Sequence, residues 1–191
     1  MDNLITSVTR TIACAIIALL AIMPANAEKL PKLKGANGLE FGWSLEKCAE
    51  KIGDVPRRMT KGAPDDPQRQ FSYAPARWGG ADWDGSVLDF NKNKLAQIGF
   101  YKTTADNSRA TFDAAKSHLT DLYGLPIMVQ QTDNNLLWTA AKGNMALLQY
   151  VRETDKSGRP QFTTYLMFID NKLVIKKARR AEAFLQELIN E

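Results

Sequence analysis

Two segments near the C-terminus are apolar on both faces of a predicted strand, and this constrains the fold more than any other feature. Along Met145–Val151, Met145, Leu147 and Val151 alternate with Ala146, Leu148 and Tyr150. Along Phe162–Phe168, one face carries Phe162, Leu166 and Phe168, and the other carries Tyr165 and Met167. A half-buried antiparallel strand normally alternates apolar with polar residues. Both faces are therefore predicted to be covered, one by helices and the other by either a second layer of the domain or a partner.

Three segments have the spacing of amphipathic helices. Ser44 is predicted to cap a helix with Leu45, Cys48, Ala49 and Ile52 on one face and Gly53 at its end. A second helix begins at Asp106 or Ser108, ends at Gly124, and has a predicted buried stripe of Phe112, Ala115, Leu119, Leu122 and Tyr123. The third, Lys177–Asn190, is predicted to bury Ala181, Phe184, Leu185, Leu188 and Ile189.

The remaining apolar runs are short and punctuated by turns, which is typical of strands. Gly38–Trp43 is predicted as a strand, and Asp54–Gln70 as a loop with one edge strand. Turns are predicted at Gly79-Gly80, at Asp84-Gly85 as a two-residue hairpin, and at Asn91–Lys94 between Val87–Phe90 and Leu95–Tyr101. The last four predicted strands are Ile127–Gln131, Leu136–Ala140, Met145–Arg152 and Gln161–Ile169. The chain is thus predicted to be α+β, an antiparallel sheet with helices packed on one face.

The first 27 residues predict export. Arg10 precedes an entirely apolar run, Ile12–Met23, which is followed by Pro24 and the small-residue site Ala25-Asn26-Ala27. This order is typical of a secretory signal peptide, and the run is too short to span a bilayer, which needs about 20 residues. We expect cleavage after Ala27, a periplasmic or secreted location, and no transmembrane segment in the mature chain. Residues 28–37 are predicted to be a mobile lead-in, and residues 38–191 a single domain.

Charge and cysteine content exclude several classes. The net charge is +4, with acids interleaved among the bases, so nucleic acid is not an expected partner. Cys14 lies in the signal segment, which leaves Cys48 alone in the mature chain. No intramolecular disulfide is possible, and the fold must be held by its own packing. Neither a cofactor nor a metal is expected, because one cysteine and one histidine, His118, do not make a ligand set.

A short motif recurs in the chain. Phe90-x-x-Asn93-Lys94-Leu95 reappears as Phe168-x-x-Asn171-Lys172-Leu173. The echo indicates either two tandem helix-β-β-β units, with a boundary near residue 105, or two chance turns of similar chemistry.

The opening Gly38-x-x-Phe41-Gly42-x-Ser44, followed by a short helix, resembles the start of small bacterial envelope domains. The doubled plan is similar to β-lactamase-inhibitor-protein-like folds. In those folds helices cover one sheet face and the other face binds a partner, so the resemblance implies a binding module and not an enzyme.

Candidates for chemistry are few. His118 has Asp121 as the only acid within reach on its helix, and Cys48 lies on an apolar helix face; both are predicted to be non-catalytic. A nucleophile elbow of the Gly-x-Ser-x-Gly type is absent from the sequence. Asp82 and Asp84, flanked by two tryptophans, are the only carboxylate pair in a site-like setting. They leave open a glycan hydrolase as an alternative.

The favoured hypothesis is a non-enzymatic binding module with no catalytic residue, whose partner is another envelope protein. The predicted partner-binding residues are Arg77, Trp78, Trp83, Tyr150, Tyr165 and Met167, because tryptophan, tyrosine and methionine are enriched at interface cores. For the segment around Trp78 and Trp83, the competing interpretation is a hairpin whose tryptophans pack inward. A small-molecule or glycan ligand is an alternative. A polyanion or lipid is another, since Lys172, Lys176, Lys177, Arg179 and Arg180 form a C-terminal basic run.

Overall fold

The computed structural model describes residues 30–53, 57–58, 69–73, 76–129, 132–155 and 157–176 of the 191-residue chain. The predicted signal segment and the helix predicted over Lys177–Asn190 lie outside the described residues. No helix among the described residues is long and apolar enough to cross a membrane.

The described elements are mainly strands. In chain order they are β1 (Gly35–Ala36), β2 (Leu39–Glu40), α2 (Leu45–Ile52), β3 (Arg57–Arg58), β4 (Arg69–Tyr73), β5 (Ala76–Trp78), β6 (Ala81–Trp83), β7 (Gly85–Asn91), β8 (Lys94–Thr104), α3 (Ala110–Tyr123), β9 (Ile127–Met128), β10 (Asn135–Thr139), the 3₁₀ turn η3 (Ala141–Gly143), β11 (Met145–Thr154) and β12 (Pro160–Ile169). Residues 171–176 are also helical. These residues lie before the predicted start of the last helix at residue 177.

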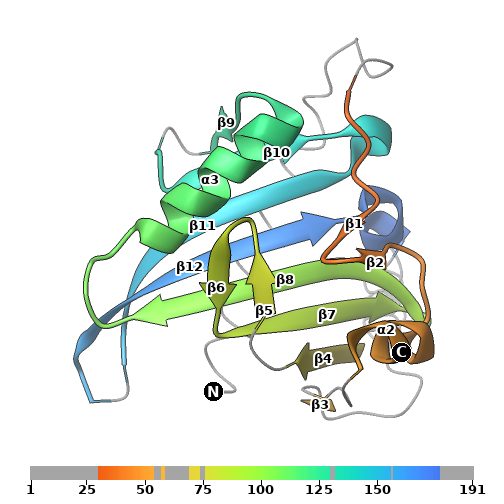
Figure 1. Cartoon of the computed structure of the whole chain (residues 1–191), viewed down its shortest axis with the longest axis horizontal. Coiled ribbons are helices and arrows are strands. Elements are labelled where there is room, and N and C mark those ends of the chain that lie inside the picture. The colour runs from red at the N-terminus through yellow and green to blue at the C-terminus, as the bar shows by residue number, and fades with distance from the viewer. Residues whose placement is uncertain are drawn as a thin grey trace, which may run out of the picture.

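Eight strands form one antiparallel sheet in the order β3-β4-β7-β8-β12-β11-β10-β9. From the central pair outward, the sheet consists of two four-stranded meanders, β8-β7-β4-β3 and β12-β11-β10-β9 (Figure 1). In the chain, the strands of the first meander follow α2 and those of the second follow α3. Their final strands, β8 and β12, pair along eight residue pairs from Phe162↔Thr104 to Ile169↔Gln97. The chain passes from one meander to the other between Thr104 and Ala110, where a boundary near residue 105 was predicted.

The sequence echo does not follow this arrangement. Asn93 lies in the turn between β7 and β8, whereas Asn171 begins the helical segment after β12. In the mirrored strand order the counterpart of the β7–β8 turn is the β11–β12 turn. The two copies of the echo therefore occupy different positions, and the motif is not a marker of equivalent units.

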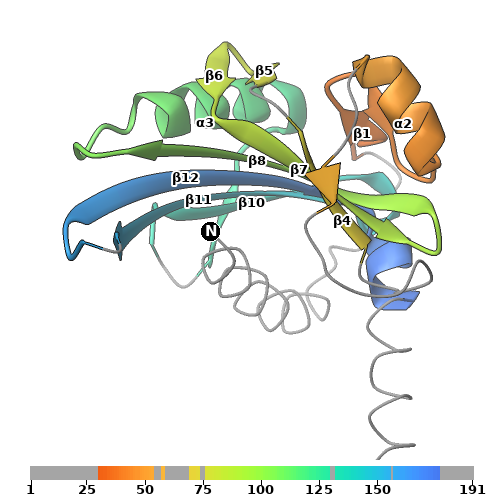
Figure 2. The same cartoon turned by 90° about the horizontal axis from the view of Figure 1, so that it is seen from below.

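The fold is α+β, as the sequence predicts, and most elements outside the sheet lie on one of its faces. Figure 2 shows α2, α3, β1 and the β5–β6 hairpin on the same side of the sheet. We call this side the helix face. Residues 171–176 lie on the other side (Figure 2).

Both predicted helices that lie within the described residues are present, with local differences. The Ser44 hydroxyl accepts a hydrogen bond from the Lys47 N–H at 3.3 Å, and Gly53 ends α2 in the left-handed conformation. In α3, Arg109 occupies the N-cap position without a side-chain cap, in place of the predicted Asp106 or Ser108. The buried residues of α3 are Phe112, Ala115 and Leu119. Leu122, which was also predicted to be buried, is 47% exposed.

The hairpin predicted at Asn91–Lys94 is confirmed, and the hairpin predicted at Asp84-Gly85 is wrong. Lys92 and Asn93 both have positive φ values, 49° and 58°, as a two-residue turn of type I′ requires. At Asp84 the chain instead leaves the β5–β6 hairpin and enters the main sheet as β7. The Asp84 Oδ2 accepts the Thr103 N–H at 2.8 Å, just beyond the last β7–β8 pair. The Asp84 carboxylate therefore makes a hydrogen bond to β8 at the point where the backbone pairing between β7 and β8 has ended.

The lead-in predicted to be mobile is packed from Leu33 onward. Leu33 and Ala36 are buried, and β1 pairs with β2. The Asn144 amide donates to the Leu33 carbonyl at 2.9 Å, and the Asn144 Oδ1 accepts the Asn171 N–H at 3.2 Å. One buried asparagine therefore ties the beginning of the described chain to its end.

The prediction that the last strands are covered on both faces is confirmed for the part of β11 and β12 near η3. On the helix face, Leu148, Leu166 and Phe168 belong to the main hydrophobic core. On the other face, Leu137, Met145, Leu147 and Ile169 form a second buried cluster. Val174 of the helical segment 171–176 packs against that cluster, so the second layer is supplied in part by the chain itself.

Candidate functional site

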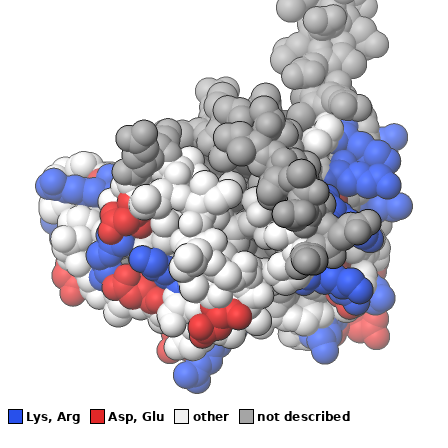
Figure 3. All heavy atoms as spheres, turned by 90° about the horizontal axis from the view of Figure 1, so that it is seen from above, with Lys and Arg blue, Asp and Glu red and all other residues white. Residues whose placement is uncertain are grey.

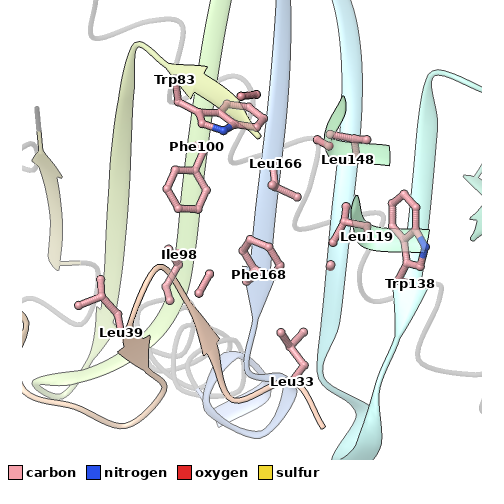
Figure 4. Packing of buried hydrophobic residues seen from close by; sticks show 14 of the residues in the cluster. Leu33, Leu39, Trp83, Ile98, Phe100, Leu119, Trp138, Leu148, Leu166 and Phe168 are labelled. Carbon is pink, nitrogen blue, oxygen red and sulfur yellow. The ribbon is translucent and has the colours of Figure 1, made fainter. Parts of the chain in front are cut away.

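The β5–β6 hairpin places both of its tryptophans against the core. Gly79 and Gly80 form the turn with φ values of 61° and 77°, and Trp78 pairs with Ala81. Trp83 is 1% exposed, and its indole N–H donates to the Trp78 carbonyl at 3.1 Å. Figure 4 shows Trp83 close to Phe100, with Phe168 on the neighbouring strand. The segment with the most site-like composition is therefore an inward-packed hairpin that covers β8 and β12.

The polar residues of this hairpin do not assemble a hydrolytic site with the tryptophans. Arg77 and Asp82 are exposed, and the Arg77 Nε lies 3.7 Å from the Asp82 Oδ1. An exposed ion pair of this kind contributes little to stability. Both oxygens of Asp84 are engaged, Oδ1 by the Lys102 ammonium at 2.6 Å and Oδ2 by the Thr103 N–H. The tryptophans, which a glycan hydrolase would use as a sugar platform, lie against the core.

Tyr150, predicted to contact a partner, lies on the helix face and is 8% exposed. Its ring stacks on Phe162 with centroids 6.0 Å apart, and its hydroxyl donates to the Asn107 Oδ1 at 2.8 Å. The Arg109 guanidinium lies 5.1 Å from the ring centroid. Tyr150 is thus a core residue that holds the start of α3 on the sheet. Neither Tyr150 nor Trp83 has the exposed surface that a partner contact needs.

The other two predicted strand residues, Tyr165 and Met167, lie on the opposite side of the sheet. Strand register aligns them with their neighbours in two cross-strand rows. The first row is Gly85, Tyr101, Tyr165, Gln149 and Asn135, and the second is Val87, Gly99, Met167, Leu147 and Leu137. We call the surface formed by these ten residues the tyrosine face. Its members span β7, β8, β12, β11 and β10, and none of them is charged.

The side chains of the tyrosine face are held but not fully buried. Tyr101, Tyr165 and Met167 are half-buried, while Leu147 and Leu137 are 6% and 4% exposed. Tyr101 lies over Gly85, where an added Cβ would be only 2.8 Å from the tyrosine hydroxyl. The Gln149 amide donates to the Asn135 Oδ1 at 3.0 Å. The face is therefore preorganised, since its side chains are fixed by cross-strand contacts.

A polar network borders the tyrosine face at one end. The Thr163 hydroxyl lies 3.1 Å from the Thr103 hydroxyl and 3.3 Å from the Glu153 Oε2. The Tyr165 hydroxyl lies 3.5 Å from each Glu153 carboxylate oxygen, at the long limit of a hydrogen bond. Burial, with a smaller contribution from the negative charge of Glu153, raises the pKa of Tyr165 to about 12.

Tyr101 and Gly99 belong to this surface, and sequence reasoning missed both. Tyr101 and Tyr165 are far apart in the chain, and only the β8–β12 register makes them direct neighbours. The alternation of Gly99 and Tyr101 with Ile98 and Phe100 was a usable signal that β8 has two different faces.

Cys48 is buried in the structure and His118 is exposed. Cys48 is fully buried in α2, and burial raises the pKa of its thiol to about 11, which disfavours the reactive thiolate. His118 is exposed on α3, and its ring lies 4.9 Å from that of Trp78. Within the described part of the chain no group of three or more His, Cys, Asp or Glu side chains is arranged to hold a metal ion.

Trp83→Ala is expected to reduce the free energy of unfolding by about 3–5 kcal/mol, because it leaves a large cavity beside Phe100. Arg77→Ala, in the same hairpin but exposed, is the matched control and should stay within about 0.5 kcal/mol of the wild type. Urea unfolding measures both. A Trp83→Ala protein as stable as Arg77→Ala would contradict the inward packing.

Tyr165 is expected to make the protein lose stability in alkali. Its pKa is about 12 in the folded protein against about 10 when unfolded, so between these values the folded state binds more protons. The free energy of unfolding should therefore fall as pH rises from about 10 to about 12. Tyr165→Phe should fall less steeply in urea titrations across this window. Equal slopes for the two proteins would show that Tyr165 is not desolvated.

Comparisons of the chain with protein-family models, with curated protein sequences and with solved structures give no significant match. The resemblance to β-lactamase-inhibitor-protein-like folds therefore stays a prediction.

Proposed function

We propose that this chain is a binding module whose tyrosine face contacts another protein of the cell envelope. The observation that carries the proposal is the composition of that face, on which half-buried Tyr101, Tyr165 and Met167 lie in two uncharged cross-strand rows that Glu153 borders at one end. Tyrosine and methionine are enriched and charged residues are depleted at the cores of protein interfaces. A sheet face that only meets water is normally polar.

The dimensions of the tyrosine face suit a protein better than a small ligand. Each row crosses five neighbouring strands, which spans roughly 20 Å at the usual strand spacing. A standard interface buries about 800 Å² on each partner. Two rows of this length, about 7 Å apart, cover roughly 300 Å², so they can form the centre of such an interface and not the whole of it. Because the side chains are already fixed by cross-strand contacts, binding them costs less conformational entropy.

The envelope location rests on the predicted signal peptide, and the predicted absence of catalysis remains part of the proposal. Asp84 is engaged by Lys102 and Thr103 and the tryptophans pack inward, so these contacts favour binding over glycan hydrolysis. Arg77 and Trp78 remain candidate contacts with a protein partner. They lie in the β5–β6 hairpin on the helix face, on the opposite side of the sheet from the tyrosine face.

A crosslinked pull-down from the envelope fraction tests the proposal, with residues 28–191 as tagged bait and mass spectrometry as the readout. Tyr165→Ala and Met167→Lys are each expected to reduce recovery of one stoichiometric partner roughly 30-fold, the loss typical of an interface hot spot of about 2 kcal/mol. Ser117→Ala, exposed on α3, is the control and should recover the partner fully.

Circular dichroism and urea unfolding establish that the three variants are folded. Recovery of the same partner by Tyr165→Ala and Met167→Lys at the wild-type level would contradict the proposal. Equal loss in all three folded variants would also contradict it, because the contact would then not be specific to the tyrosine face.

A further inference from the structure

Five exposed lysines are brought to one end of the molecule by three segments that are distant in sequence. Lys32 and Lys34 lie in the lead-in, Lys142 in η3, and Lys172 and Lys176 in the helical segment 171–176. Figure 1 shows the lead-in, η3 and this last helix together at the same end of the sheet. We call these five residues the lysine end.

The three segments are fixed to one another by hydrogen bonds. The Ala141 N–H donates to the Pro31 carbonyl at 2.9 Å, which joins η3 to the lead-in. Asn144 connects Leu33 to Asn171 through its two amide atoms. The clustering of charge is therefore a property of the fold, and the sequence reveals only the C-terminal part of it.

The lysine side chains point away from the core. Leu33 is buried, whereas Lys32 and Lys34 on either side of it are exposed. Lys172 and Lys176 are four residues apart on one helix face, while Asn171 and Val174 pack inward. Lys142 has a φ of 65°, an uncommon conformation for a residue with a side chain.

These charges are not neutralised by the part of the protein that the structure describes. None of the five ammonium groups lies within 4.0 Å of a described carboxylate. The acid nearest to them in sequence, Asp170, is half-buried and accepts the Leu173 N–H at 2.8 Å through its Oδ1. Figure 3 shows basic side chains gathered at this end of the molecule.

We propose that the lysine end is a second binding site, which holds the protein against an anionic phospholipid surface. Clustered lysines bind anionic lipid headgroups through charge attraction, at about 1 kcal/mol for each residue near the surface. Lysine is a compact point charge that does not need the two-pronged geometry of arginine. Single-stranded nucleic acid is less well suited, since its binding sites interleave bases with aromatic platforms and the three described segments contain no aromatic residue.

The lysine end differs from the tyrosine face in chemistry, although the two are neighbours. The tyrosine face has no charged member. The helical segment with Lys172 and Lys176 packs, through Val174, on the cluster that contains Leu137 and Leu147. The lipid site is tested with vesicles that carry no protein partner.

Co-sedimentation of residues 28–191 with vesicles tests the inference. Binding to mixed phosphatidylcholine–phosphatidylglycerol vesicles is expected, with none to phosphatidylcholine alone. The double variant Lys142→Gln/Lys172→Gln should bind about 25-fold more weakly, or about fivefold for each lysine. Raising the ionic strength from about 0.01 to about 0.1 M shortens the Debye length from about 30 to about 10 Å and should release the wild type.

The matched control is Arg152→Gln/Arg159→Gln, which removes the same net charge from exposed positions near the far end of β11 and in the turn before β12. It should retain most of the binding. Equal loss in the two double variants would overturn the inference, because net charge alone would then explain binding. Absence of wild-type binding to anionic vesicles, or tighter binding to a single-stranded DNA oligonucleotide, would also overturn it.

Discussion

The pairing of β8 with β12 is the interaction on which the rest of the structure depends. It joins two four-stranded meanders into one sheet through eight residue pairs at its centre. On the helix face the same pairing places Phe100 beside Leu166, which the β5–β6 hairpin and α3 help to cover. On the other face it places Tyr101 beside Tyr165. The core and the candidate binding surface are thus opposite sides of one strand pair, and loss of this register would disrupt both.

The two faces of the central strands are covered to different extents. On the helix face, aromatic residues from the sheet and the hairpin fill the core, and Trp83, Phe100 and Phe168 are nearly inaccessible. On the tyrosine face, the end near η3 is buried by the chain itself, with Val174 on the second cluster. Toward the middle of the sheet Tyr101 and Tyr165 are only half-buried, although no charged residue separates them. This change along one face, from covered to half-covered, is what favours a protein contact there.

Sequence patterns predicted the local structure well and the long-range arrangement poorly. Capping by Ser44 and Gly53 and the turn at Lys92-Asn93 are decided by neighbouring residues, so composition and spacing suffice to predict them. Asp84-Gly85 has the composition of a hairpin turn, but its position is decided by Thr103 and Lys102, which the Asp84 carboxylate binds across β8. Tyr150 and Tyr165 look alike in the sequence, and only the burial of each side of the sheet separates a core residue from a half-exposed one. The sequence predicted only the C-terminal part of the lysine end, because the other lysines come from distant parts of the chain that Asn144 holds together.

Photocrosslinking from the tyrosine face tests the binding account most directly. A photoreactive amino acid would replace Met167 on that face and, in a separate protein, Ser117 on the exposed side of α3. After irradiation in the envelope fraction, the account predicts a crosslink to one partner protein from position 167 and none from position 117. A crosslink to the same partner from position 117 alone would contradict the account, because it would place the partner on the helix face.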